Sequence, residues 1–296
     1  MESVDTIRIA LGVSIAIIML GMGLSLTISD FKRISENPKG VLIGLFNQLI
    51  LLPIIAYLLV FVFNLNGSLA VGLMLIAACP GGATSNLITN LAKGDLGLSV
   101  TLTAFSSMIT VFTIPLIVNF SLGNFMGEEG EISLSFLDSF KQIVLLTVVP
   151  VVIGMFIRTR SVQFADKMEK PVKIASAVLM AIIIAGAVAK NKDVLAAAIP
   201  TIGPAVIALN IITMVIGFFI GNVLNLDLRQ KICISIESGI QNGTLALFVG
   251  SLGVMANYSE ILLAPALYSI LMFFTGAIFA YLSARMVNKS VRKNNL

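Results

Sequence analysis

Long apolar runs alternate with short polar segments along almost the whole chain. A helix needs about 20 consecutive apolar residues to cross a bilayer, and most of these runs approach or exceed that length. The pattern therefore predicts an all-α polytopic membrane protein with about nine transmembrane helices. The first run is too long for the apolar region of a signal peptide and has no A-x-A-like cleavage site. The predicted spans lie at about residues 7–28, 41–64, 69–93, 96–122, 136–157, 174–189, 195–223, 229–254 and 261–286.

The composition supports this class and excludes others. Of the 296 residues, 57% are hydrophobic and 11% are charged, and the mean hydropathy is +1.02. A soluble globular domain carries about 25% charged residues, so a soluble fold is excluded. The net charge of +4 does not indicate a nucleic-acid partner, because the basic residues lie in loops beside the apolar runs. The chain has no His and two Cys, both inside apolar runs, so neither a His/Cys metal site nor a disulfide framework is expected.

The basic residues also predict an orientation in the membrane. With nine spans, all but four of the 19 Lys and Arg residues fall on one side. Because cytoplasmic flanks of transmembrane helices are enriched in Lys and Arg, this side is assigned to the cytoplasm. We therefore expect an odd number of spans in the inner cell membrane, with the amino terminus outside and the carboxyl terminus in the cytoplasm. The four exceptions are Arg8, Lys141, Lys190 and Lys192.

Two of the apolar runs are interrupted by polar residues. Residues 79–90 read C-P-G-G-A-T-S-N-L-I-T-N, and residues 234–247 read I-S-I-E-S-G-I-Q-N-G-T-L-A-L. A proline and two glycines break the first helix, and broken backbone is tolerated in a bilayer only where protein or a wet cavity surrounds it. An ordinary helix kink is the alternative interpretation of this run. Two such segments in one chain indicate one shared polar site.

Glu237 is the one acidic residue in the interior of a predicted span, since the others fall in loops, tails or at span ends, and no intramembrane Lys or Arg is available to neutralise it. A carboxylate at membrane depth costs about 2.5–3.5 kcal/mol, so it is normally retained where it meets a partner charge or a bound ion. The neighbouring Gln, Asn, Ser and Thr side chains offer oxygen ligands, which suit hard cations. A cation site is therefore the functional hypothesis. The alternative is a carboxyl kept protonated by burial and bonded to a neighbouring helix.

Other polar side chains occur within the spans. Asn47 and Gln48 lie in the interior of the second run, where Gln48 is either a ligand or a bridge between helices. Helical spacing predicts a polar face on the fourth span, made by Ser99, Thr103, Ser106 and Thr110. These hydroxyls either face the site or bond carbonyls of their own helix. Helix breaks also expose carbonyls, which favour cations, and N–H groups, which favour anions, so one site can serve a cation and an anionic substrate together.

Four motifs resemble those of the bile acid:sodium symporter family, in the family order over nearly the whole chain. They are G-M-G-L-S-L at 21–26 with D-F at 30–31, C-P-G-G-A-T-S-N at 79–86, L-A-K-G-D-L-G-L-S-V-T-L-T-A at 91–104 and I-E-S-G-I-Q-N-G at 236–243. The resemblance implies two broken helices that cross near the membrane midplane, and inverted repeats of four plus five spans here. It also implies a core domain, at about 41–122 and 195–286, and a panel domain, at about 7–28 and 136–189.

The resemblance further assigns residues to two sodium sites and a substrate site. The first sodium set is Ser85, Asn86, Ser99, Thr103 and Glu237. The second sodium set is Gln48, Glu237, Ser238, Ile240 and Gln241, with Ser238 and Ile240 acting through backbone carbonyls. The substrate-binding set is Ala83, Thr84, Asn210, Asn242, Gly243, Met272 and Phe273. At Met272 and Phe273 the chain departs from bile-acid-binding relatives, which have a His-Asn pair there.

The function implied by this resemblance is sodium-coupled import of a small organic anion by alternating access. Because the His-Asn pair is absent, we expect a keto or hydroxy acid such as pantoate or pyruvate in preference to a bile acid. Two sodium ions are expected as coupling ions, with no other cofactor. The expected protein is a monomer in the lipid bilayer.

Functions of other classes were weighed on the same residues. A proton-coupled organic anion exporter or exchanger is the main alternative, with Glu237 as the titrating carboxyl and pH-driven, sodium-independent flux as its signature. A channel is disfavoured because the polar groups gather at the helix breaks and do not line one continuous path. A receptor is disfavoured because no long soluble segment is present to carry a signal. An enzyme is not expected, since no nucleophile and base can be paired in the sequence.

Overall fold

The computed structural model describes residues 2–36, 38–127, 134–190 and 192–294, and within them the chain is helical with no strand. The helices of the first half are α1 (Glu2–Ser25), α2 (Ile28–Glu36), α3 (Pro38–Phe46), the π-helix η1 (Asn47–Leu51), α4 (Leu52–Val62), α5 (Gly67–Ala78), α6 (Ala83–Leu91) and α7 (Leu96–Met126). Those of the second half are α8 (Phe136–Ile143), the π-helix η3 (Val144–Val148), α9 (Val149–Arg160), α10 (Val162–Lys190), α11 (Lys192–Val223), α12 (Leu228–Gly239), α13 (Gly243–Gly250), the 3₁₀ turns η4 (Gly253–Asn257) and η5 (Ser259–Leu262), and α14 (Leu263–Asn294).

Six helical stretches of the described chain are long and apolar enough to cross a membrane. They are Pro38–Val62, Leu96–Met126, Phe136–Arg160, Ala196–Val223, Leu228–Gly250 and Ser259–Ser290. α5 and α6 make a seventh as a pair bent by 63°, and α1 contains a shorter apolar stretch, Leu11–Ser25. Large apolar side chains such as Phe112, Leu116 and Phe120 are exposed on these helices, as expected for surfaces in contact with lipid. The chain is therefore an integral membrane protein.

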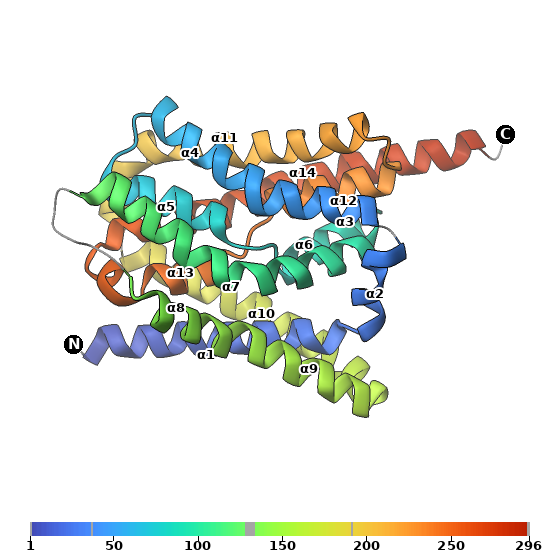
Figure 1. Cartoon of the computed structure of the whole chain (residues 1–296), viewed down its shortest axis with the longest axis horizontal. Helices are drawn as coiled ribbons and strands as arrows, with labels where there is room; N and C mark the ends of the chain where they lie inside the picture. The colour runs from blue at the N-terminus through green and yellow to red at the C-terminus, as the bar shows by residue number, and fades with distance from the viewer. Residues whose placement is uncertain (1, 37, 128–133, 191, 295–296) are drawn as a thin grey trace.

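The long helices lie roughly along one axis, and α1 and α9 run along one side of the molecule (Figure 1). α1 packs along α9 and α10, whereas α7 packs along α5 and α11 packs along α12. Glycine permits the close approach of α1 and α9, because a Cβ atom added to Gly23 of α1 would come within 2.2 Å of the Val151 carbonyl oxygen of α9, and one added to Gly154 of α9 within 2.5 Å of the Leu20 carbonyl oxygen of α1. Small residues at such crossings are typical of helix packing in membranes.

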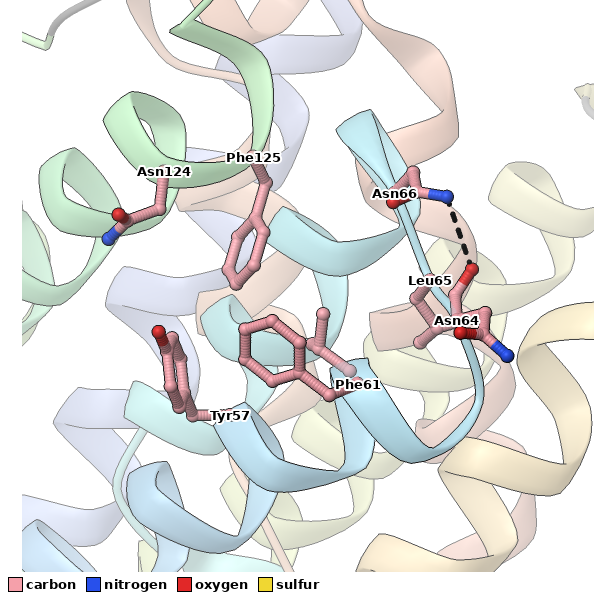
Figure 2. A pocket seen from close by; sticks show the side chains of 8 residues that line it. Tyr57, Phe61, Asn64, Leu65, Asn66, Asn124 and Phe125 are labelled. Atoms are coloured by element: carbon pink, nitrogen blue, oxygen red, sulfur yellow. Dashed lines mark hydrogen bonds between the residues drawn. The ribbon is translucent and has the colours of Figure 1, made fainter.

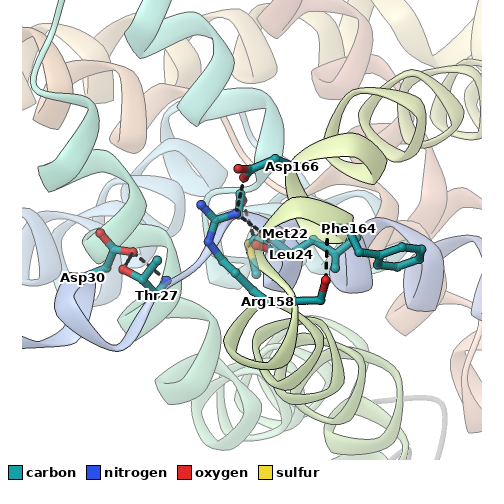
Figure 3. A network of polar contacts seen from close by, with 9 residues as sticks. Met22, Leu24, Thr27, Asp30, Arg158, Phe164 and Asp166 are labelled. Atoms are coloured by element: carbon teal, nitrogen blue, oxygen red, sulfur yellow. Dashed lines mark hydrogen bonds and ion pairs between the residues drawn. The ribbon is translucent and has the colours of Figure 1, made fainter.

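A polar tie joins α1, α9 and α10 near one end of the molecule (Figure 3). The Arg158 Nη1 atom donates to the Leu24 carbonyl oxygen at 2.7 Å and pairs with Asp166 Oδ1 at 3.2 Å. Leu24 lies in the last turn of α1, where backbone carbonyls have no partner within the helix. The guanidinium therefore satisfies the end of one helix and links it to two others.

The burial of the predicted spans differs strongly. Within the most apolar window of Phe136–Arg160, 22% of residues are buried, whereas all residues in that of Leu228–Gly250 are buried. The helix pair that carries Glu237 thus forms the centre of the molecule, and Phe136–Arg160 lies at its periphery. A charged residue at membrane depth is expected to face the protein interior in this way.

One boundary prediction was wrong. Residues 158–173, which read as the most basic loop, are helical except for Ser161, because α9 continues to Arg160 and α10 begins at Val162. The predicted short span at 174–189 is therefore only the second part of α10. Gln, Ala, Lys, Met and Glu in this segment are good helix formers, and their propensity continues the helix beyond the apolar run.

A pocket of about 270 Å³ lies where the ends of α4 and α7 meet (Figure 2). Its wall combines aromatic rings and amide side chains, namely Tyr57, Phe61, Phe125, Asn64, Asn66 and Asn124. α5 begins beside this pocket at Gly67 and leads away from it to the helix break at its other end. The pocket is therefore separate from the polar residues singled out by the sequence.

Candidate functional site

The two interrupted helices meet at their breaks. Between α5 and α6 the chain is extended, with Cys79 at ψ 150° and Gly82 at φ −147°, and Pro80 supplies no backbone N–H. Between α12 and α13 the extended residue is Ile240. The Asn242 backbone N–H donates to the Pro80 carbonyl oxygen at 2.8 Å, which joins the two breaks directly. Two segments far apart in the sequence therefore form one crossing.

A cluster of oxygen atoms surrounds the carboxylate of Glu237 at this crossing. Ser99 Oγ donates to Glu237 Oε1 at 2.5 Å, and Thr103 Oγ1 donates to Glu237 Oε2 at 2.9 Å. Asn86 Oδ1 lies 2.7 Å from Ser99 Oγ and 3.3 Å from Thr103 Oγ1, and Ser85 Oγ lies 3.5 Å from Thr103 Oγ1. The structure thus brings together all five residues of the first predicted sodium set.

The chemistry of this cluster suits a hard cation. Each hydroxyl carries one proton, yet Ser99 Oγ faces acceptor oxygens of both Glu237 and Asn86, and so does Thr103 Oγ1. The oxygen lone pairs therefore outnumber the protons between them. Glu237 is 3% exposed, and no Lys or Arg of the described chain forms an ion pair with it. A buried negative charge amid neutral oxygen ligands is a donor set that fits a cation such as sodium.

Gly81 makes room for the carboxylate. A Cβ atom added to Gly81 would lie 2.5 Å from Glu237 Oε2, closer than real Cβ contacts, and 3.2 Å from Ser85 Oγ, which is a tight contact. From the sequence this glycine was interpreted only as a helix breaker. In the structure it also forms part of the wall of the oxygen cluster.

The second predicted sodium set lies beside the first and clamps both breaks. Gln48 Nε2 donates to the Cys79 carbonyl at 2.9 Å and to Gln241 Oε1 at 2.8 Å. Gln241 Nε2 donates to the carbonyls of Ser238, at 2.8 Å, and Glu237, at 3.3 Å. The breaks thus present several carbonyl and amide oxygens at one place. Ile240, between Ser238 and Gln241 in the sequence, is also buried.

The predicted substrate residues Asn242, Ala83 and Thr84 meet at the crossing. Asn242 Oδ1 caps α13 by accepting from the Leu245 N–H at 3.0 Å, and a Cβ atom added to Gly82, the residue before α6, would lie 3.8 Å from Asn242 Cγ. Ala83 and Thr84 begin α6 and are partly exposed. Asn242 Nδ2 is buried and has no hydrogen-bond partner. Two helix N-termini and an unpaired donor at one place favour a negatively charged group.

Of the other predicted substrate residues, Gly243 begins α13 directly after Asn242, whereas Asn210, Met272 and Phe273 have other surroundings. Gly243 lies tightly against Ser269 of α14. Asn210 Nδ2 donates to the Gly239 carbonyl at 2.7 Å, in the last turn of α12. Met272 is fully buried, whereas its neighbour Phe273 is 42% exposed, so these two side chains do not form a single wall.

Some residues at the site were not in the predicted sets. Thr89 Oγ1 lies 3.3 Å from Ser99 Oγ, and the Tyr268 hydroxyl donates to the Gly239 carbonyl at 2.9 Å. Thr89 had a signal in the sequence, because it follows the first break among other polar residues. Tyr268 had none, since its contact depends on how α14 packs against α12.

The described chain is a helical membrane protein, and its two broken helices cross at a buried, oxygen-rich site. This combination is typical of ion-coupled membrane transporters. Comparison with known proteins agrees, because a sequence model of the Sodium Bile acid symporter family matches residues 12–198. The chain belongs to this family.

Three relatives illustrate the family. The chain is 30% identical to the "Uncharacterized sodium-dependent transporter YocS" of Bacillus subtilis (strain 168), over 93% of this chain and 83% of that protein. It is 30% identical to the "Probable sodium/metabolite cotransporter BASS1, chloroplastic" of Arabidopsis thaliana, over 81% of this chain and 58% of the relative. It is 26% identical to the human "Ileal sodium/bile acid cotransporter", over 91% of this chain and 77% of the relative. The chain thus belongs to a family of sodium-dependent membrane transporters and not to a family of enzymes.

Proposed function

We propose that the protein is a symporter that imports a small organic anion, of the pantoate or keto-acid type, together with two sodium ions by alternating access. The observation that carries this proposal is the buried carboxylate of Glu237, which accepts from two hydroxyls of α7 and has no ion-pair partner in the described chain. Such a charge is stable at membrane depth when a mobile cation neutralises it.

The proposed architecture has nine spans. α1 and α10 cross the membrane in addition to the seven apolar stretches, which places the two chain ends on opposite sides. The beginning of α1 and the end of α14 lie at opposite ends of the molecule, which supports this arrangement (Figure 1). The first four spans and the last five form inverted repeats, and the broken pair α5–α6 or α12–α13 is followed in each repeat by a long final helix, α7 or α14.

The proposed domains follow the packing of the helices. α1, α8, α9 and α10 form the panel, and α3 to α7 with α11 to α14 form the core, which contains the whole site. The basic residues assign the end that holds Arg158 and Lys93 to the cytoplasm. The proposed transporter is a monomer, and all its proposed ligands come from this one chain.

The two ions share Glu237. The first ion binds Ser85, Asn86, Ser99, Thr103 and Glu237, and the second binds Gln48, Gln241 and the carbonyl end of α12 at Glu237, Ser238 and Ile240. Binding of both ions neutralises the carboxylate and holds the two breaks in one arrangement. The anion then binds beside them at Asn242 and the N-termini of α6 and α13, with Ala83 and Thr84 on its accessible side.

Coupling to two ions provides enough energy for accumulation. When two sodium ions enter with one monovalent anion, one net positive charge crosses, which is worth about 2.3 kcal/mol at 100 mV. A tenfold sodium gradient adds about 1.4 kcal/mol for each ion. Together these terms supply about 5 kcal/mol, enough to concentrate the anion roughly several thousandfold.

Replacement of the carboxylate tests the proposal. We expect Glu237→Ala to abolish sodium-dependent uptake into proteoliposomes, while the protein remains in the membrane. Glu260→Ala is the matched control, because Glu260 is exposed in the turn η5. This variant should transport normally. Unchanged sodium-dependent uptake by Glu237→Ala would refute the assignment.

The substrate and the coupling ion can be found in one screen. A ligand that binds the folded protein raises its melting temperature, so purified protein is heated with organic acids in the presence and absence of sodium. The proposal expects small keto or hydroxy acids to stabilise the protein only when sodium is present. A proton-coupled exchanger would instead respond to pH without sodium, since a buried carboxyl bonded to two hydroxyls also suits proton transfer.

A further inference from the structure

Asn47 is a second polar residue in the interior of the span Pro38–Val62, next to Gln48. It is 2% exposed, and neither predicted sodium set includes it. Burying an amide in a membrane without hydrogen bonds is costly, so an asparagine in this place is expected to have a specific partner. Its partner lies at the end of α12.

The π-helix η1 determines where Asn47 points. The Leu52 N–H donates to the Asn47 carbonyl, which is the wide i to i+5 bond of a π-helix, and Pro53 follows without an N–H of its own. In an α-helix, adjacent side chains do not face the same neighbour. Within η1, Asn47 reaches Ser238 in the last turn of α12 and Gln48 reaches Gln241 in the break that follows, so the wider turn supplies two adjacent contacts to this segment.

The contact of Asn47 is with Ser238. The Ser238 hydroxyl donates its single proton to the Ile234 carbonyl at 2.7 Å, so it can only accept from the Asn47 amide, whose Nδ2 lies against it. The Ser238 carbonyl is at the same time bonded to Gln241 Nε2. Asn47 therefore holds the side chain of a residue whose carbonyl belongs to the second ion set, as Gln48 holds Gln241.

The opposite side of Asn47 is fixed by α11. A Cβ atom added to Gly217 would lie 3.1 Å from Asn47 Nδ2 and 3.1 Å from the Ile234 carbonyl oxygen. Glycine at this position allows α11 to close over both groups. The Asn47 amide is thus confined between α11 and α12 and has little freedom to turn away from Ser238.

We propose that Asn47 is a positioning residue for the second cation and acts through Ser238. The inference rests on the proposed function, because it assumes a cation at the carbonyls of Ser238 and its neighbours. Asn47 fixes the last turn of α12 so that these carbonyls converge, and its loss lets that turn adopt other arrangements. In the first cluster the Glu237 carboxylate is held by Ser99 and Thr103 of α7, and the Asn47 amide bonds Ser238 and none of these three side chains.

The sodium dependence of Asn47→Ala tests this role. Loss of a residue that orients a metal ligand typically lowers metal affinity by about 10- to 100-fold, so half-saturating sodium should rise by at least about tenfold. With two sodium ions the Hill coefficient has an upper limit of about two, and it should fall to about one in the variant. Both quantities are measured from melting temperature against sodium concentration and from uptake. Substrate KM at saturating sodium should stay unchanged.

Asn119→Ala is the matched control. Asn119 likewise ties its helix to another segment, through two hydrogen bonds with the Leu134 backbone at 2.7 and 3.0 Å, but it lies near the far end of α7. It should lower the melting temperature without changing the Hill coefficient. An Asn47→Ala protein that is less stable but keeps the wild-type sodium curve would overturn the inference and leave the proposed function standing.

A double variant tests whether Asn47 acts through Ser238. Ser238→Ala removes the hydroxyl and keeps the carbonyl, so the combination with Asn47→Ala should be no worse than Asn47→Ala alone. Additive losses of sodium affinity would overturn the proposed route. If the wild-type protein shows no stabilisation by sodium at all, the proposed function fails and this inference fails with it.

Discussion

The two helix breaks at the centre of the molecule differ in shape, charge and enclosure. α5 and α6 are bent by 63°, and the residues that begin α6, Ala83 and Thr84, are partly exposed. The stretch Leu228–Gly250 around the other break counts as a single span, is buried from Ile232 to Gly250, and carries the charge of Glu237. The accessible break thus contributes neutral groups, and the enclosed break contributes the carboxylate.

This difference separates two tasks within one crossing. Electrostatic attraction between opposite charges is strongest where water is excluded, so the enclosed break is the better place to bind the cation. An anionic substrate suits the partly exposed N-terminus of α6, where Asn242 supplies a free donor. The comparison therefore predicts that substitutions around the Glu237 carboxylate affect sodium, whereas substitutions at Asn242 and at the N-terminus of α6 affect the substrate.

The largest expected effect comes from Asn242→Asp. The aspartate keeps the oxygen that caps Leu245 but replaces the unpaired Nδ2 donor by a second carboxylate oxygen. Like charges placed against each other cost several kcal/mol, so substrate KM should rise by about 100-fold or more. Sodium should still stabilise the protein. Asn124→Asp, at an exposed position near the end of α7, is the control and should transport normally. If both variants transported the substrate equally well, the anion would not bind at Asn242.

The next largest effect distinguishes two adjacent glycines of the first break. In Gly81→Ala the new Cβ atom would crowd Glu237 Oε2 and Ser85 Oγ, whereas in Gly82→Ala the nearest atoms lie at 3.8 Å, an ordinary contact. Overpacking costs about 1–3 kcal/mol, which corresponds to a loss of sodium affinity of about 5- to 150-fold for Gly81→Ala. Sodium titrations followed by melting temperature measure it. If Gly82→Ala weakened sodium binding as much, the carboxylate would not be the group that Gly81 accommodates.

A smaller effect separates two serines on one face of α7. Ser99 donates to Glu237, whereas Ser106 donates to the Thr103 carbonyl of its own helix at 3.2 Å. Side-chain hydrogen bonds in membranes reach about 1.7 kcal/mol, so Ser99→Ala should raise half-saturating sodium by about tenfold. Ser106→Ala should leave it within about twofold, because a bond to the own backbone contributes little. Uptake measured against sodium concentration compares the two variants. Matching curves would mean that neither hydroxyl contributes to sodium binding and that both only pack against neighbouring groups.

These serines also show how far the sequence predicts the site. The spacing of Ser99, Thr103, Ser106 and Thr110 correctly predicted a common buried face, since helical periodicity is a local property. Ser106 and Thr110 nevertheless bond carbonyls of α7, as the structural alternative held, while Ser99 and Thr103 reach Glu237. Which hydroxyl reaches the carboxylate depends on where the two breaks cross α7, and no local pattern contains that information.

The fold was predictable to a similar degree. The thickness of the bilayer sets the length of an apolar run, so the runs identified the main helices, and Glu237 was identifiable because it is the one charge inside them. Helix ends were less predictable, because residues 162–173 continue α10 by helix propensity outside any apolar run. Contacts such as that of Tyr268 with Gly239 depend on tertiary packing and left no trace in the pattern.

The smallest expected effect lies away from both breaks and sets the baseline for the comparison. Arg158→Ala removes the tie between Leu24 of α1 and Asp166 of α10 (Figure 3). An average hydrogen bond between membrane helices is worth about 0.6 kcal/mol, so the melting temperature should fall by only a few degrees. Arg160→Ala is the control, because Arg160 is exposed and lies over the Phe156 ring of its own helix. Half-saturating sodium should be unchanged in both variants. A change in half-saturating sodium in Arg158→Ala would mean that the packing of α1, α9 and α10 also sets sodium affinity. The two breaks would then not determine this affinity alone.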